Sequence, residues 1–159
     1  MTDRIAHQIR LAGPWEVLLR EGDWQRCSLP FTPEPDRSAC TSGSEIAAGP
    51  GIQLRRKFHR PTGINSRTIL LIEVTADIGV PFVQVNDQLV AASNTQPSED
   101  ATDKQPVNNV SSRFPVTDLI QPFNSLQFEI PEASAVSVTV YAARLLICES
   151  QSESPSSRS

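Results

Sequence analysis

The chain has 159 residues, of which 38% are hydrophobic and 20% charged, and its formal net charge is -4. This composition is typical of one folded domain and argues against a nucleic-acid-binding protein, whose surface normally carries a surplus of positive charge. No apolar run is long enough for a membrane span or a secretory leader, so we expect neither a membrane nor a nucleic acid as partner.

The cysteines are few and widely spaced. They stand at positions 27, 40 and 148, and no Cys-x-x-Cys motif occurs. This pattern favours reduced thiols over a disulfide framework, and with two histidines in the chain it does not suggest a zinc site. Together with the missing leader, it predicts a cytoplasmic protein.

Strand-like segments and proline-rich turns alternate through the first half of the chain. Residues 1–10 show no clear pattern and are predicted to be a flexible N-terminus, with a single β-sandwich domain over 11–148. PWEVLL (14–19) and WQRCSL are the first strand candidates. The segment IQLRRKFH (52–59) has the period of two that is typical of a strand. Its two predicted faces are Ile52, Leu54, Arg56 and Phe58 on one side, and Gln53, Arg55, Lys57 and His59 on the other.

The middle of the chain contains a buried strand, a hairpin and a long polar segment. RTILLIEV (67–74) is apolar enough to be a central strand covered on both faces. FVQV and QLVAA form a predicted hairpin with Asn86-Asp87 at its tip, since both residues tolerate positive φ. The polar crossing from Ala92 to Arg113 is either a tether or a binding loop, and its composition favours the tether.

Strand patterns return after the crossing. A short helical turn is predicted over 117–120, ending before Pro122. SLQFEI (125–130) and VSVTVYAARLLI (136–147) are the last two strand candidates, and the tail 149–159 is Ser-rich, polar and predicted to be disordered. The expected inward positions are Leu126, Phe128 and Ile130 in the first of these strands, and Val136, Val138, Val140 and Ala142 in the second.

About eight strands with long end loops and no helix-length pattern predict an all-β, antiparallel sandwich or barrel. Several segments, taken in order, resemble the sugar-binding jelly-roll domain of family 2 glycoside hydrolases, which belongs to the galactose-binding-like sandwiches. These segments are GPWEV, DWQRCSLP, LRRKFHRP, LIEVTADIGVPFVQVNDQLV and FPVTDLIQPFNSLQFEI.

The resemblance departs from the family in three places. The family's hairpin Asn-Gly is Asn86-Asp87 here, its Gly-Asn is Phe123-Asn124, and the catalytic barrel that follows the family's sandwich is missing. The resemblance therefore implies a galactose-binding-like jelly roll of about eight strands and a distant link to carbohydrate, without implying catalysis.

Four side chains are candidates for contact with a ligand. Trp24 follows a turn, so its ring is either packed or available to stack on a sugar. His59 and Arg60 end a strand and can reach a carboxylate or a hydroxyl, although most such pairs are only solvated strand ends. Asn94 lies in the polar crossing, where its amide can bond to sugar hydroxyls.

Alternation places Arg56 among the core-facing residues of its strand, where an unpaired guanidinium is costly. We therefore expect a structural ion pair between Arg56 and Glu73, with Asp118 as the alternative partner.

No metal or other cofactor is expected. Glu99, Asp100 and Asp103 could offer oxygen ligands to calcium, but their spacing matches no calcium motif, and a solvated acidic loop is favoured. No G-x-S-x-G motif and no distinctive carboxylate pair occurs, which predicts a protein that is not an enzyme.

The sequence thus favours a non-catalytic, carbohydrate-binding-like recognition module with a glycan as its partner. A structural or protein-interaction domain is the alternative. Such a domain would associate with itself, or would bind an acidic protein through the basic polar face formed by residues 53, 55, 57 and 59. A small glycosidase or esterase is the least favoured reading.

Overall fold

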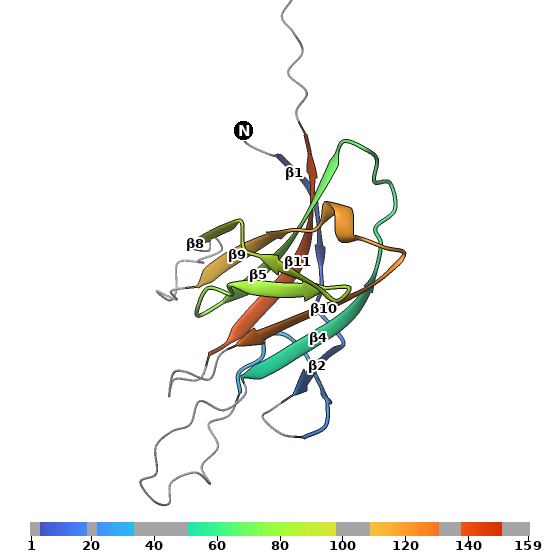
Figure 1. Ribbon diagram of the computed structural model, residues 1–159. Helices are drawn as coiled ribbons and strands as arrows, with labels where there is room; N and C mark the ends of the chain where they lie inside the picture. The colour runs from blue at the N-terminus through green and yellow to red at the C-terminus, as the bar shows by residue number, and fades with distance from the viewer. Residues whose placement is uncertain (1–3, 19–21, 34–50, 98–108, 131–137, 151–159) are drawn as a thin grey trace, which may run out of the picture.

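The fold was obtained as a computed structural model, which describes residues 4–18, 22–33, 51–97, 109–130 and 138–150 (Figure 1). Two antiparallel sheets, one of five strands and one of six, enclose a single apolar core. The predicted all-β sandwich is therefore confirmed. The described residues form eleven strands where about eight were expected, because three polar segments also form strands.

The five-stranded sheet consists, in spatial order, of β1 (Arg4–Arg10), β11 (Val140–Glu149), β5 (Thr68–Ala76), β9 (Val110–Pro115) and β8 (Asn94–Pro97). The six-stranded sheet consists of β3 (Gln25–Cys27), β2 (Trp15–Leu18), β4 (Ile52–His59), β10 (Phe123–Ile130), β6 (Phe82–Val85) and β7 (Gln88–Ala91). One 3-10 turn, η2 (Thr117–Leu119), precedes β10 and matches the predicted helical turn.

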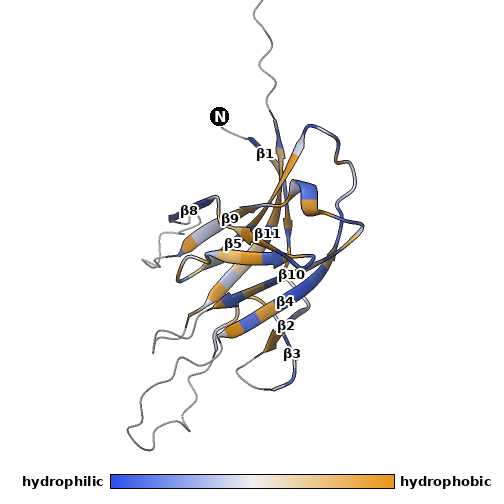
Figure 2. Cartoon of the chain, in the orientation of Figure 1, coloured by the Kyte–Doolittle hydropathy of each residue, from blue (hydrophilic) through white to orange (hydrophobic). Residues whose placement is uncertain are grey.

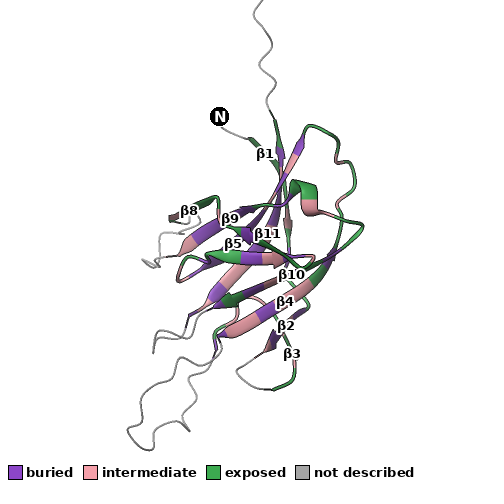
Figure 3. Cartoon of the chain, in the orientation of Figure 1, coloured by how far each residue is buried: buried purple, intermediate pink, exposed green. Residues whose placement is uncertain are grey.

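β4 and β10 form the centre of the six-stranded sheet and follow the predicted alternation. They pair along their whole length, from Phe123 opposite His59 to Ile130 opposite Ile52. Hydropathy alternates at the start of β4 and is interrupted by the three basic residues 55–57, while Leu54 and Phe58 are its buried residues (Figures 2 and 3). Inward side chains of both strands, including Leu54 and Phe128, are buried, whereas the polar residues between them face solvent.

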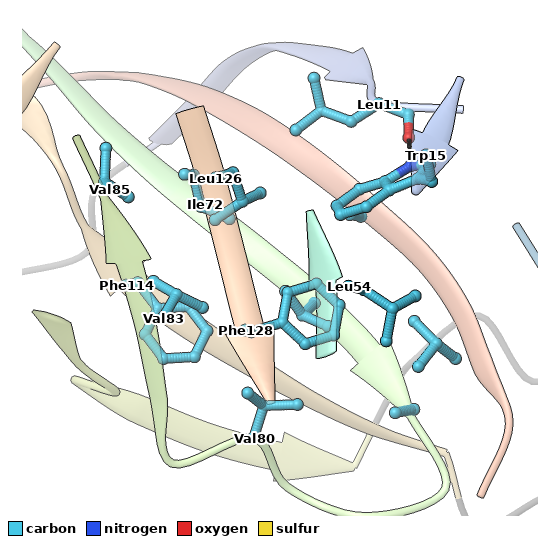
Figure 4. Packing of buried hydrophobic residues seen from close by; sticks show 14 of the residues in the cluster. Leu11, Trp15, Leu54, Ile72, Val80, Val83, Val85, Phe114, Leu126 and Phe128 are labelled. Atoms are coloured by element: carbon cyan, nitrogen blue, oxygen red, sulfur yellow. Dashed lines mark hydrogen bonds between the residues drawn. The ribbon is translucent and has the colours of Figure 1, made fainter. Parts of the chain in front are cut away.

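β5 is the central strand of the other sheet, as its apolar sequence predicts. It lies between β11 and β9 and presents Leu70, Ile72 and Val74 to the core. Figure 4 shows Ile72 and Phe114 of this sheet beside Leu126 and Phe128 of the other.

Trp15 closes one side of the core. Its ring meets Phe128 edge to face at 5.7 Å, and its Nε1 donates a hydrogen bond of 2.7 Å to the Leu11 carbonyl (Figure 4). The buried indole is thus satisfied as both an apolar and a polar group, which a core tryptophan requires.

Residues 4–10 are not part of a flexible terminus, although one was predicted over 1–10. Residues 4–10 form β1, which pairs with β11 from Arg4 opposite Glu149 to Arg10 opposite Arg144. An edge strand with mostly exposed side chains is held by main-chain bonds, so its sequence carries little apolar periodicity. The described sandwich therefore begins at Arg4, before the predicted boundary at Leu11. Residues 151–159 of the predicted tail lie outside the described residues.

A bulge in β11 changes the predicted orientation of the last strand. Val138 and Val140 are buried as expected, and Val136 lies outside the described residues. Between Val140 and Ala142, β11 gains one residue relative to β5, so that Ala142 faces outward. Beyond the bulge Ala143 and Leu145 face the core instead. A single extra residue reverses the faces of a strand because its side chains alternate.

The predicted hairpin is confirmed in β6 and β7. Its tip residues have positive φ angles, 49° for Asn86 and 67° for Asp87. Asn86 also ties the tip to its surroundings: its Nδ2 donates to the Leu119 carbonyl at 2.8 Å, and its Oδ1 accepts from the amide of Ser125 at 3.0 Å.

The polar crossing is partly a strand. Its beginning forms β8, which pairs with β9 from Asn94 opposite Arg113 to Pro97 opposite Val110. Residues 98–108 lie outside the described residues. The prediction of an unpaired loop from Ala92 to Arg113 is therefore wrong at both of its ends. β8 is a short polar edge strand, and such strands lack a strong period-two signal. β9 lies between β5 and β8, and its two consecutive buried serines, Ser111 and Ser112, obscure its alternation.

The two phenylalanines of β10 provide a matched test of the core. Phe128 is 3% exposed and Phe123 is 74% exposed. We expect Phe128→Ala to lower the free energy of unfolding by about 3–5 kcal/mol, because it leaves a cavity. Phe123→Ala should change it by less than about 0.5 kcal/mol. Urea denaturation followed by circular dichroism measures both, and equal effects would contradict the assignment of faces.

Asp77, directly after β5, holds the start of β11. It accepts bonds of 2.7 Å from the Thr139 amide and from the Tyr141 hydroxyl. The bond to Asp77 is the main cause that raises the pKa of Tyr141, with burial a smaller one. The folded protein therefore holds the phenol proton more tightly than the unfolded chain. This contribution to stability is complete below the ordinary pKa and is lost as the pH rises through the raised one.

Tyr141 is the chain's one tyrosine, so its ionisation can be followed by ultraviolet absorbance. We expect a titration midpoint above the ordinary value of 10.0, and a return toward that value in Asp77→Asn. Circular dichroism at each pH controls for unfolding. An unchanged midpoint in the variant would show that Asp77 does not retain the proton.

Candidate functional site

The four predicted ligand contacts do not come together. His59 ends β4 of the six-stranded sheet and Trp24 directly precedes β3 of the same sheet. Arg60 directly follows β4, and Asn94 lies on β8 of the five-stranded sheet. Each must therefore be judged with its own neighbours. The richest set of neighbours lies on the outer face of the six-stranded sheet.

One row of side chains crosses this outer face. Strand register places one residue from each of the six strands in the row. In spatial order they are Arg26, Glu16, Arg55, Gln127, Gln84 and Leu89. We call this set the amide row. Beside it, Gln53 accepts a hydrogen bond of 3.1 Å from Nε2 of Gln127, so the centre of the face consists of planar amide groups.

Trp24 lies over the amide row at Arg55 and is half-buried. The guanidinium carbon of Arg55 lies 3.9 Å from the centroid of its ring, a distance suited to cation–π attraction. Arg55 is held in turn by Glu16, through a bond of 2.7 Å from Nε to Oε2. That bond lowers the pKa of Glu16. Arg55 therefore covers one face of the indole and holds the ring on the sheet. Trp24 is both packed and partly exposed, which combines the two alternatives that the sequence left open.

His59 and Phe123 form the second aromatic group of this face. They are opposite each other in the register of β4 and β10, and their rings meet edge to face at 5.0 Å. The backbone amide of Arg60 bonds to the Pro122 carbonyl at 3.1 Å, which fixes the chain beyond the histidine. The ring of Phe123 is the most exposed large apolar side chain among the described residues, at 74%.

Phe123 was absent from the sequence candidates, although a signal for it exists. The alternation that buries Leu126 and Phe128 places Phe123 on the outside when it is extended back to the start of β10. Phe82 and Leu89 could have been found in the same way, because they face outward from β6 and β7. An aromatic residue that strand alternation places on the outer face is therefore a stronger candidate for ligand contact than one chosen for its residue type alone.

The predicted ion pair between Arg56 and Glu73 is not formed. Arg56 shares the inward face of β4 in the six-stranded sheet, whereas Glu73 points outward from β5 in the other sheet. Glu73 instead pairs with Arg113 at 2.8 Å and with Arg144 at 3.8 Å. Among the described residues, the buried Nε and Nη1 of Arg56 have no hydrogen-bond partner, neither Asp118 nor another group. Burial lowers the pKa of Arg56.

Other reactive groups of the described residues are dispersed. Cys27 is a free thiol whose pKa is raised by burial, and Cys148 is buried. Across residues 4–18, 22–33, 51–97, 109–130 and 138–150, no three His, Cys, Asp or Glu side chains are grouped as a metal ion would require. The acidic residues considered for calcium, Glu99, Asp100 and Asp103, lie outside those ranges. No helix in the same ranges has the length and apolar character of a membrane span.

No protein-family model matches the chain, and no curated protein is significantly similar to it. The resemblance to a glycosidase sugar-binding domain therefore stays a prediction. What the surface can bind has to be inferred from its own geometry.

Comparison of Arg55 with Arg56 can measure the cost of burying a charge that has no partner. Arg55 contacts Glu16 and Trp24, whereas two buried donors of Arg56 have no acceptor among the described residues. We expect Arg56→Met to raise the free energy of unfolding by about 1–3 kcal/mol, because it removes buried donors that have no acceptor. Arg55→Met, which removes the contacts with Glu16 and Trp24, should lower it by about 1 kcal/mol or less. Chemical denaturation measures both. A destabilised Arg56→Met protein would show that the guanidinium is paired in solution.

Proposed function

We propose that the chain is a non-catalytic recognition module that binds a carbohydrate on the outer face of the six-stranded sheet. The observation that carries the proposal is the exposed ring of Phe123, held at a rigid strand end by the edge contact with His59. A flat apolar ring is the natural support for the apolar face of a pyranose. Because β4 and β10 fix both rings, little side-chain freedom is lost on binding.

Polar groups of the same face suit the hydroxyls of a sugar. Lys57 and Ser125 are opposite each other in the register of β4 and β10, two positions from the ring pair, and both are exposed. The amides of Gln53 and Gln127 follow farther along the same two strands. Amide, hydroxyl and ammonium groups offer the donors and acceptors that orient a polar ligand, and ligands commonly bind where a few such groups surround an apolar support.

A second candidate, self-association through β7, is favoured by a different observation. β7 is the edge strand of its sheet, and Leu89 on it is 71% exposed, beside Phe82 on β6 at 49%. Exposed apolar side chains on an edge strand are typical of a surface that pairs with another strand. Light scattering at high protein concentration tests this function. A dimer that Leu89→Lys disperses would support it.

Calorimetric titration with a panel of neutral and acidic oligosaccharides tests the carbohydrate proposal. We expect at least one saccharide to bind, and Phe123→Ala to weaken that binding by about tenfold or more, since tenfold corresponds to about 1.4 kcal/mol. The fold should be kept, because the side chain is exposed.

Phe82→Ala is the matched control, because it removes another exposed phenylalanine from the same face. It should leave saccharide affinity unchanged. Failure of every saccharide to bind, or equal losses in the two variants, would overturn the proposed site.

A further inference from the structure

The two sides of the Phe123 ring differ in charge. On the β4 side, the exposed Lys57 shares the outer face with His59, and the exposed Arg60 directly follows the strand. The strand spacing and the rise per residue place the Cα atoms of Lys57 and Phe123 roughly 8 Å apart, within reach of a lysine side chain. Within the described ranges, the side chains of Lys57 and Arg60 form no ion pair. Two positive charges are therefore available beside the ring.

Two carboxylates lie on the other side of the ring, around the hairpin tip. Asp87 is the second tip residue and Asp118 belongs to η2, and both are exposed. Asn86 joins these segments to β10, because its side-chain amide donates to the Leu119 carbonyl and accepts from the backbone amide of Ser125. The ring thus stands at a boundary, with cations toward β4 and carboxylates toward β6.

Two acidic residues belong to the strands of this sheet, and neither neutralises the β4 side. Glu16 is bonded to Arg55, which is the main cause of its lowered pKa, and Lys57 acts on the same carboxylate as a smaller cause from a greater distance. Glu129 stands at the far end of β10, roughly 20 Å along the strand from Phe123. The positive charge next to the ring is therefore left for a ligand.

We propose that the saccharide bound on this face is acidic, with its carboxylate or sulfate group directed over β4 toward Lys57 and Arg60. The proposal rests on the carbohydrate surface of Phe123, to which it adds the charge and the orientation of the ligand. A pyranose whose apolar face covers the phenyl ring directs its substituents outward past the edge of that ring. An anionic substituent meets two positive charges in the direction of β4, whereas in the opposite direction it meets Asp87 and Asp118. Attraction to exposed cations at contact distance should raise affinity by about tenfold at low salt.

The test compares three trisaccharides by calorimetric titration: neutral galactotriose, trigalacturonate and a sulfated galactotriose. We expect at least one acidic trisaccharide to bind about tenfold more tightly than the neutral one, and this preference to shrink as salt is added. Which of the two acidic ligands binds more tightly tells whether a carboxylate or a sulfate is recognised. Lys57→Gln and Arg60→Gln should each reduce the preference by about threefold, with the fold kept because both residues are exposed.

Arg4→Gln is the matched control, because it also removes one positive charge from an exposed residue, in this case on the other sheet. It should leave the preference for an acidic trisaccharide unchanged. Equal losses in the Arg4 and Lys57 variants, or a neutral trisaccharide that binds as tightly as both acidic ones, would overturn the inference and leave the sugar surface of Phe123 in place. If no trisaccharide binds, or if Phe123→Ala weakens none of them, the carbohydrate surface itself is wrong and the preference falls with it.

Discussion

The structure depends on one constraint: each strand must send every second side chain into the space between the two sheets. β5 satisfies it with Leu70, Ile72 and Val74, and β4 and β10 satisfy it from the opposite side. Trp15 packs edge to face on Phe128 and closes the side of this space. Burial of these side chains supplies the main favourable energy of folding, and it also decides which residues remain outside. The candidate binding surface consists of residues left over from that selection.

The two outer faces consequently differ in chemistry although the sheets share a core. On the six-stranded sheet, Trp24 lies over Arg55, which is neutralised by Glu16, and the exposed ring of Phe123 stands at the end of β10. On the five-stranded sheet, the outward Glu73 is buried and pairs with Arg113 and Arg144.

The local sequence pattern was sufficient to predict the central strands. It did not predict strands that are held at a sheet edge by main-chain pairing, and it did not show which of the two sheets each strand joins. The period of two in β4, the apolar run of β5 and the Asn86-Asp87 turn all predicted what the structure shows. β1 and β8 were missed because edge strands are held by main-chain bonds, which leave little trace in sequence. The ion pair expected between Arg56 and Glu73 failed because alternation gives the face of a residue but does not tell which sheet its strand joins.

The bulge in β11 shows how the face of a side chain depends on chain length as well as on residue type. After the extra residue between Val140 and Ala142, Arg144 faces outward beside Glu73 and Leu145 faces inward. Deletion of that extra residue would leave both faces unchanged, because Val140 and Ala142 would then alternate as in a regular strand. A one-codon deletion farther along β11 would instead move the following side chains to the opposite face, so the bulge is where the strand should best tolerate the loss of a residue during evolution.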